Sequence, residues 1–348
     1  MILADIVPPA FFAQQAEWVL WALAGAAIAL LVVGADRAVG AAAKLAGALG
    51  MSKVIIGATV VSLGTTSPEA AVSVNAAIKG DADLALGNGV GSIICDTALI
   101  FGLACLIARV PKDRFVLNRH GWLKVAVGAI LTLASLGLWW AAGDIHNVLM
   151  PRWMGAALLG GLVVYLYLSV RWSRRHPQMV PEEASAAMKA DHKAARAVGN
   201  LLMLVAGLAL VVGGSELMVG SMKEVCVRHR VPPAVIAVTF VAFGTSLPEL
   251  VTAIASVLKG HADIMVGNII GADILNVLFV IGASATAMPL HIEPVFFTFL
   301  LPTMMLVLIL FRLFISADGP SFRRWHGALL LAVYAAFTAG TVALGIQK

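Results

Sequence analysis

Two glutamates, Glu69 and Glu249, lie inside long apolar stretches and close the same short motif, GTTSPE in one case and GTSLPE in the other. An ionisable side chain inside hydrocarbon costs on the order of 3 kcal/mol unless it meets a partner or a cation. Lys and Arg occur only at the ends of these stretches and of the apolar segments that follow them. Carboxylates without basic partners predict a cation-binding site.

A proline precedes each glutamate, at Pro68 and Pro248. Proline has no amide hydrogen, and in a helix its ring clashes with the carbonyl group four residues earlier. Those carbonyl groups belong to Gly64 and Gly244. Each motif is therefore expected to interrupt a helix and to free backbone oxygens beside the glutamate.

Further oxygen-bearing side chains recur at helical spacing. Thr65 and Thr245 lie four residues before the glutamates, so a hydroxyl and a carboxylate share one helix face. The apolar segments that follow repeat this spacing with Ser92 and Asp96 in the first half and with Ala272 and Asn276 in the second. Carboxylate, hydroxyl, amide and carbonyl oxygens suit hard cations such as calcium and sodium rather than zinc or copper.

The elements that must position these residues are membrane helices. Of the 348 residues, 60% are hydrophobic and only 12% are charged, whereas a soluble domain has roughly 25% charged residues. The net charge of +5 is scattered between apolar runs, which excludes nucleic-acid binding. An all-α polytopic membrane protein with ten transmembrane helices is predicted, because about 20 apolar residues cross a bilayer. The ten segments are 18–36, 54–79, 84–108, 121–142, 153–171, 198–219, 234–259, 264–287, 294–315 and 326–345.

An internal repeat relates the two halves of the chain. With an offset of 180 residues, 59–69 falls on 239–249 and 79–96 falls on 259–276 without a gap. Each half contains five predicted helices, an odd number, so the halves must insert as two inverted five-helix repeats. This arrangement is typical of secondary transporters, whose substrate site lies where the repeats meet. The expected units are a first repeat over 1–171 with its ion-binding motif at 59–102, a cytoplasmic linker at 172–197, and a second repeat over 198–348 with its motif at 239–282.

Within the repeated stretch, the pattern G-N-x-x-G occurs at 87–91 and at 267–271. Small residues at this spacing allow membrane helices to approach closely. The Lys and Arg residues indicate the orientation, because cytoplasmic loops are enriched in them. If both termini lie outside, 18 of the 24 fall on the cytoplasmic side and six on the outer side, and Lys223, Arg228 and Arg230 are the outer residues that fit this orientation least well.

The doubled and inverted pattern G-T-[ST]-x-P-E followed by G-N-x-x-G resembles the α-repeats of sodium/calcium exchangers in the calcium/cation antiporter superfamily, especially the short prokaryotic members. The resemblance implies that Glu69 and Glu249 bind both calcium and sodium. It implies a bacterial or archaeal cytoplasmic (inner) membrane location, and no cofactor or obligate protein partner. The remaining implied ligands are Thr65, Thr245, Thr66, Ser246, the carbonyl groups of Ser62 and Ala242, and the side chains of Asp96, Asn276 and Ser92.

Several positions depart from the family pattern, among them Ser67, where the family usually has leucine. Ala272 lacks a hydroxyl that holds a sodium ion in several members. The acid and amide at the ends of the second motif, Asp96 and Asn276, are reversed in some members. Asp273 adds an acid three residues before Asn276 and is a further candidate ligand or proton carrier.

The expected function is a secondary active antiporter that exchanges calcium for sodium by alternating access, with helices 1 and 6 sliding across the rest. One alternative is a proton/calcium antiporter, since clustered carboxylates can exchange a metal for protons. A second alternative is a cation channel or ion sensor, against which the inverted repeat argues. An enzyme is not expected, because the sequence contains no H-E-x-x-H or G-x-S-x-G motif.

Overall fold

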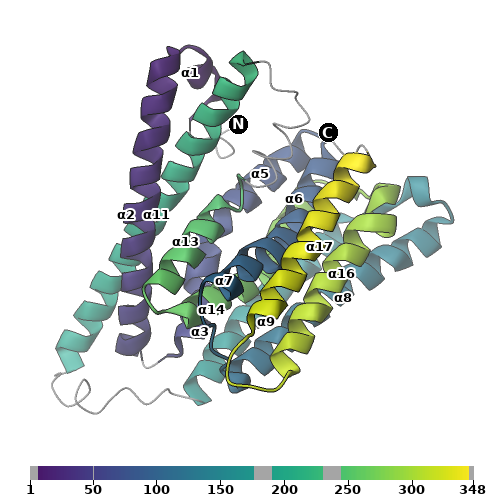
Figure 1. Cartoon of the computed structure of the whole chain (residues 1–348). Helices are drawn as coiled ribbons and strands as arrows, with labels where there is room; N and C mark the ends of the chain where they lie inside the picture. The colour runs from purple at the N-terminus through teal and green to yellow at the C-terminus, as the bar shows by residue number, and fades with distance from the viewer. Residues whose placement is uncertain (1–6, 50, 176–189, 230–243, 345–348) are drawn as a thin grey trace.

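The computed structural model describes residues 7–49, 51–175, 190–229 and 244–344, and Figure 1 shows their arrangement. Within these ranges the chain is helical apart from two very short strands. Among the described residues, eight helices are long and apolar enough to cross a membrane. The expected segments at 54–79 and 234–259 correspond to shorter apolar helices, Lys53–Thr65 and Leu247–Leu258, and the second of these segments lies partly outside the described residues.

The elements of the first half run in the following order: α1 (Pro9–Ala13), α2 (Glu17–Leu49), α3 (Lys53–Ile56), η1 (Gly57–Val61), α4 (Ser62–Thr65), α5 (Ser67–Ile78), α6 (Ala82–Ile94), η2 (Cys95–Ile100), α7 (Phe101–Ile107), α8 (Arg114–Ala142), η3 (Ile145–Asn147), β1 (Leu149–Met150) and α9 (Arg152–Arg175).

The second half contains α11 (Ala190–Arg228), α13 (Leu247–Leu258), α14 (Ala262–Leu275), η5 (Asn276–Ile281), α15 (Gly282–Ala287), β2 (Leu290–His291), η6 (Phe296–Leu300), α16 (Leu301–Ser316) and α17 (Arg324–Ala343). The strands β1 and β2 pair antiparallel, with Leu149 opposite His291.

The predicted interruption at the first glutamate motif is confirmed. Helix α4 ends at Thr65 and α5 begins at Ser67, with Pro68 in its first turn, where its missing amide hydrogen costs nothing. Helix α13 likewise begins beside its proline. The Gly244 carbonyl is not left free, because it accepts a hydrogen bond from the Leu247 amide at 3.3 Å.

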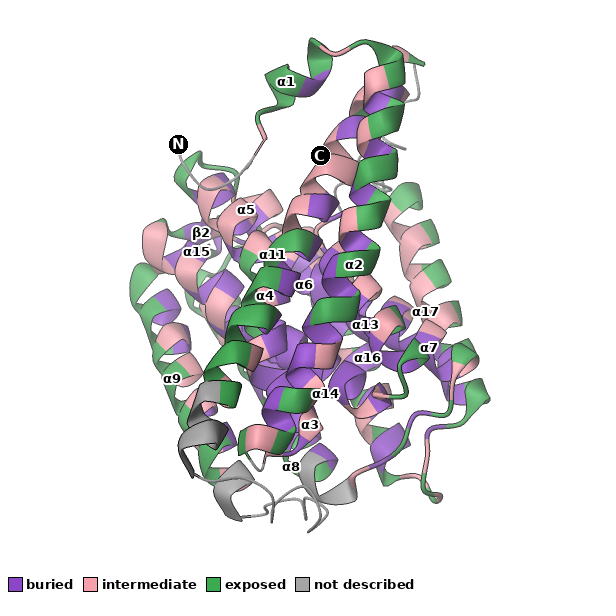
Figure 2. Ribbon diagram, turned by 90° about the vertical axis from the view of Figure 1, so that its left-hand side faces the viewer, coloured by how far each residue is buried: buried purple, intermediate pink, exposed green. Residues whose placement is uncertain are grey.

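Helix α14 lies at the centre of the molecule. Its membrane span is 94% buried, against 33% for that of α2, and Figure 2 shows the same contrast in colour. Its glycines allow this position: a Cβ atom on Gly267 would overlap the Val54 carbonyl oxygen, and one on Gly271 would lie 2.5 Å from the Ala58 carbonyl oxygen. The close approach predicted from the second G-N-x-x-G motif is therefore confirmed. For the first motif the prediction is wrong, because a Cβ atom on Gly87 or Gly91 would meet no atom of the described residues within 4 Å.

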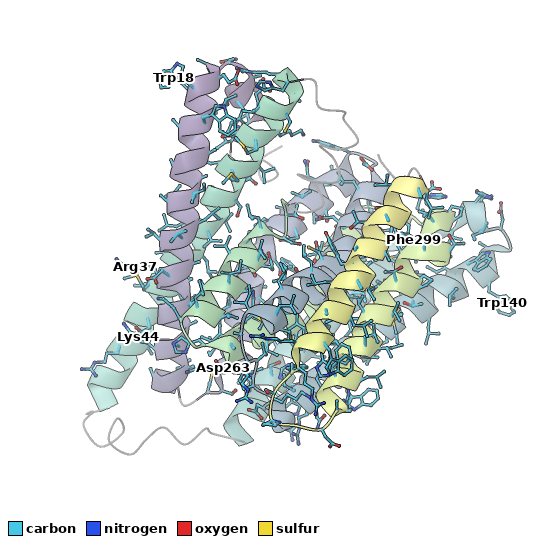
Figure 3. All side chains as sticks on the ribbon, in the orientation of Figure 1. Trp18, Arg37, Lys44, Trp140, Asp263 and Phe299 are labelled. Carbon is cyan, nitrogen blue, oxygen red and sulfur yellow. The ribbon has the colours of Figure 1, made fainter. Side chains whose placement is uncertain are left out.

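Helices α2 and α11 pack side by side along one flank, whereas α16 and α17 lie on the other (Figure 1). Helices α2 and α11 are longer than the apolar segments predicted for them, 18–36 and 198–219. In Figure 3, Trp18 lies at one end of α2, and Arg37 and Lys44 lie toward the other. An ion pair between Asp36 and Lys259, with Oδ1 and Nζ 2.7 Å apart, connects α2 to the end of α13.

Candidate functional site

Four carboxylates are buried in the middle of the helical bundle. Glu69 lies in the first turn of α5, Glu249 in the first turn of α13, Asp96 in η2 and Asp273 in α14. Each residue is at most 2% exposed. Glu69 interacts electrostatically with Glu249 and Asp96, and Asp96 interacts with Glu249 and Asp273. The structure thus brings together the acidic residues that the sequence predicted for the site.

Many side-chain oxygen atoms of the four carboxylates and of neighbouring Ser and Asn residues are buried without a hydrogen-bond partner among the described residues. Such groups are rare, because removing them from water without a partner carries a penalty of about 1–3 kcal/mol each. Their concentration here is chemically suited to binding a cation. The atoms are Glu69 Oε2, Ser92 Oγ, Asp96 Oδ1 and Oδ2, Ser246 Oγ, Glu249 Oε2, Asp273 Oδ1 and Asn276 Oδ1.

The motif threonines form hydrogen bonds between the two halves of the chain. Thr65 Oγ1 donates to Asn268 Oδ1 at 3.3 Å, and Thr245 Oγ1 donates to Asn88 Oδ1 at 3.1 Å. The 180-residue offset relates these two pairs to each other. Thr66 Oγ1 donates to Glu249 Oε1 at 3.2 Å, so the first motif also contacts the second glutamate.

The asparagines of the two G-N-x-x-G motifs are site residues that the sequence analysis missed. Asn88 Nδ2 donates to Ser73 Oγ at 2.9 Å and to the Glu69 carbonyl oxygen at 3.3 Å, while Asn268 Nδ2 donates to Thr252 Oγ1 at 3.3 Å. An amide at the same position of both repeats was the signal that could have identified them.

Two π-helical turns contain the residues at the ends of the second motifs. Asp96 lies in η2, and Asn276 opens η5. A π-helical turn inserts one residue into the α-helical register and frequently occurs at functional sites. Without the inserted residue, the side chains that follow the turn would lie on a different helix face relative to the side chains that precede it.

The two carbonyl groups expected as ligands have different outcomes. The Ser62 carbonyl oxygen accepts hydrogen bonds from the Thr66 amide at 2.8 Å and from Thr65 Oγ1 at 3.3 Å. Thr65 has one hydroxyl hydrogen, which it can give either to this oxygen or to Asn268 Oδ1. When it bonds Asn268, one lone pair of the Ser62 carbonyl oxygen remains available to a cation. Ala242 lies outside the described residues.

Asp273 has a basic partner, although the absence of such partners was expected for Glu69 and Glu249. Lys124 of α8 extends into the bundle, and its Nζ lies 2.5 Å from Asp273 Oδ2, with both side chains 1% exposed. Only the segments around the two motifs were considered in the prediction, and α8 is a different helix that packs against α14. A lone lysine within the apolar segment 121–142 was the available signal.

Acidic groups alone do not form a metal site. Within the described ranges, no group of three or more His, Cys, Asp and Glu side chains lies close enough to hold one ion. A cation in this region would therefore need the hydroxyl, amide and carbonyl oxygens that surround the carboxylates. This mixed oxygen environment is the one that calcium and sodium prefer.

Comparisons with known proteins agree with this chemistry. The family model described as sodium/calcium exchanger protein matches residues 19–171 and 199–343. The inner membrane protein YrbG of Escherichia coli is 34% identical over 87% of this chain and 93% of its own. The putative antiporter CaxA of Alkalimonas amylolytica is 34% identical over 75% of this chain and 79% of its own.

Two further comparisons cover nearly the whole chain. The sodium/calcium exchanger MaX1 of Methanosarcina acetivorans is 28% identical over 89% of this chain and 95% of its own. A structure of the sodium-calcium exchanger NCX_Mj superposes with a TM-score of 0.79 at 26% identity, covering 93% of this chain and 99% of that one. By its sequence, its helical fold and its buried oxygen-rich centre, this chain belongs to the sodium/calcium exchanger family of membrane transporters.

Proposed function

We propose that this protein is a secondary active antiporter that moves calcium out of the cytoplasm in exchange for sodium. The observation that carries the proposal is the cluster of unpartnered carboxylate oxygens on Glu69, Asp96 and Glu249, which belong to both halves of the chain. Thr65, Thr66, Thr245, Ser246, Ser92, Asn276 and the Ser62 and Ala242 carbonyl groups are the proposed neutral ligands.

Charge counting supports exchange between the two ions. Glu69, Asp96 and Glu249 carry three negative charges when ionised. One calcium ion leaves this group at −1, and three sodium ions neutralise it. Two occupancies of similar charge can exclude each other without leaving a strongly charged, water-poor site, which would be costly. Mutual exclusion of this kind is the requirement for coupled exchange.

The test is calcium uptake into vesicles that contain the purified protein. An outward sodium gradient should drive uptake, and a pH gradient of equal size should not. Uptake driven only by the pH gradient would identify a proton/calcium antiporter. Calcium flux that needs no counter-ion on the other side would identify a channel, and calcium binding without flux would identify a sensor.

We further propose that the fold consists of ten transmembrane helices in two inverted five-helix repeats, 1–171 and 198–348, joined by the linker at 172–197. The reciprocal Thr–Asn pairs support this arrangement, because each pair joins one repeat to the other. Alternating access then follows from movement of α2 and α11 against the remaining helices.

The proposed location is the cytoplasmic membrane, with both termini outside. Arg37 and Lys44 lie toward the end of α2 that this orientation places in the cytoplasm (Figure 3). Single cysteines at the exposed residues Asn147 and Asp318 test it. A membrane-impermeant thiol reagent added outside should label position 147 and not position 318. The opposite pattern would reverse the orientation.

A further inference from the structure

Lys124 has a complete set of partners inside the bundle. Its Nζ contacts Asp273 Oδ2 at 2.5 Å and donates a hydrogen bond to Thr97 Oγ1 at 2.7 Å. Thr97 Oγ1 in turn donates to Asp273 Oδ2 at 2.5 Å. The ring centroid of Phe311 lies 3.9 Å from the same Nζ. A carboxylate, a hydroxyl and an aromatic face together surround one positive charge.

This charged group occurs on only one side of the repeat. The 180-residue offset relates Lys124 to Met304, Thr97 to Val277 and Asp273 to Ile93. These three counterparts are all buried in the main hydrophobic core. The repeated scaffold therefore accommodates apolar side chains at the equivalent positions, and the charges are an addition to it.

The added charges change the balance of the ion site. Asp273 would be a fourth carboxylate beside Glu69, Asp96 and Glu249, and Asp96 interacts electrostatically with both Asp273 and Lys124. The ammonium group cancels the added negative charge. One oxygen of Asp273, Oδ2, is used by Lys124 and Thr97, so Asp273 is joined to the protein's own cation.

We propose that the Lys124 ammonium is a tethered cation, which occupies a monovalent-cation position formed by Asp273 and Thr97 and so withholds Asp273 from the transported ions. This inference rests on the proposed exchange of calcium and sodium, and it makes Lys124 a residue that determines ion selectivity and stoichiometry. Removing the amine leaves a carboxylate and a hydroxyl that a free sodium ion can bind. Removing the amine and the carboxylate together leaves no such position.

The test compares Lys124→Met with Lys124→Met/Asp273→Asn. Methionine is suitable because it is the residue at the related position 304. Lys112→Met is the matched control, since Lys112 also lies over a phenylalanine ring, that of Phe322, but outside the site. The first readout is thermal unfolding of the purified variants in sodium chloride and in choline chloride. The second is the sodium dependence of calcium flux in vesicles.

Lys124→Met should gain a stabilisation by sodium, seen as a rise of several degrees in the unfolding midpoint over the choline value, because a cation that binds only the folded state stabilises it. The wild type also binds sodium at the proposed exchange site, so the quantity compared is the sodium-minus-choline rise of each variant. That rise should be several degrees larger in Lys124→Met than in the wild type, and the control and the double variant should keep the wild-type rise. In flux, the sodium Hill coefficient of Lys124→Met should exceed that of the wild type by about one, and the double variant should return to the wild-type value.

Three results would overturn the proposal: no added response of Lys124→Met to sodium, an equal added response in the double variant, or failure of Lys124→Met to fold in any salt while the double variant folds. The last result would identify a purely structural ion pair. If the double variant does not fold, Asp273→Asn decides. Its unbalanced ammonium should weaken calcium binding by roughly tenfold or more, and an unchanged calcium affinity would reject the tethered cation.

The unfolding measurement separates this inference from the proposed function, because it requires no transport. A wild type without sodium-driven calcium flux would disprove the exchange while the sodium response of Lys124→Met still reports on Asp273. Conversely, normal exchange by the wild type without that response would reject only the role of Lys124.

Discussion

The two halves of the chain share one glutamate each in the candidate site, Glu69 and Glu249, but differ in the residues that lie behind them. On one side, Lys124, Thr97 and Asp273 form a buried charged group. On the other side, the positions related by the 180-residue offset are occupied by Met304, Val277 and Ile93, all of them buried apolar residues.

This difference separates what the fold needs from what the ions need. Replacing a buried ion pair by well-packed apolar residues is often neutral or stabilising, so stability alone does not explain the charged side. The apolar side demonstrates that the scaffold tolerates such residues. Under the proposed function, features present in both halves, such as Glu69 and Glu249, serve ion binding in general, whereas the charged group without a repeat-related equivalent adjusts it.

The largest expected effect lies in the shared part. Glu69→Gln and Glu249→Gln should each reduce sodium-driven calcium flux to the background of protein-free vesicles, because each removes a charged ligand while keeping the side-chain shape. The control is Glu293→Gln, which makes the same change at a partly exposed loop residue and should retain flux. If either site variant transports calcium at the wild-type rate, the two halves do not share one site.

A smaller effect should distinguish the two asparagines. Asn88 makes three hydrogen bonds and Asn268 makes two. At about 1 kcal/mol for each bond, Asn88→Ala should lower the free energy of unfolding by about 3 kcal/mol and Asn268→Ala by about 2 kcal/mol. Unfolding in denaturant measures both values. If Asn268→Ala lowered the free energy of unfolding more than Asn88→Ala does, the number of hydrogen bonds would not determine the contribution of the two asparagines.

Thr97→Val should lower the free energy of unfolding by about 2 kcal/mol, since it removes a hydroxyl that bonds both charged groups but leaves their direct contact. The mirror change, Val277→Thr, should cost less than about 1 kcal/mol, because a threonine hydroxyl in a helix can bond the carbonyl one turn earlier. Unfolding in denaturant measures both variants. If both lowered the free energy of unfolding equally, position 97 would need its hydroxyl no more than position 277 needs its apolar side chain.

The smallest expected effect concerns the hydroxyl that the second half lacks. Ala272→Ser should strengthen sodium competition against calcium by a factor of a few, since one neutral ligand contributes about 1 kcal/mol. Calcium affinity in sodium-free buffer should stay nearly unchanged. Ser92→Ala should have the opposite effect on competition. Calcium binding during a sodium titration measures both variants, and no change in either would exclude these positions from the sodium pathway.

Much of the helical framework could be predicted from the sequence, because apolar length and the proline motif act locally. The interruption between Thr65 and Ser67 follows directly from Pro68. The π-helical turns at Asp96 and Asn276 could not be predicted, since no proline or glycine pair forces them. They depend on packing between helices that are distant in the sequence.

The same limit explains what was missed in the site. The glutamates and the motif threonines repeat at a fixed spacing, so their grouping can be recognised from the sequence alone. The counterpart of Lys124 in the second half is the apolar Met304, and the contact of Lys124 with Asp273 depends on how α8 packs against α14. The comparison of the two repeats identifies residues that occur in both, and Lys124 occurs in only one.

The ion pair between Asp36 and Lys259 has a consequence for the balance between conformations. Its side chains are 56% and 31% exposed, and a pair of this kind contributes about 0.2–1 kcal/mol. Under the proposed alternating access between two states, this energy changes the ratio of their populations by a factor of only about 1.4 to 5. The contact thus favours the arrangement in which α2 touches the end of α13 while leaving the other state well populated, and added salt weakens that preference.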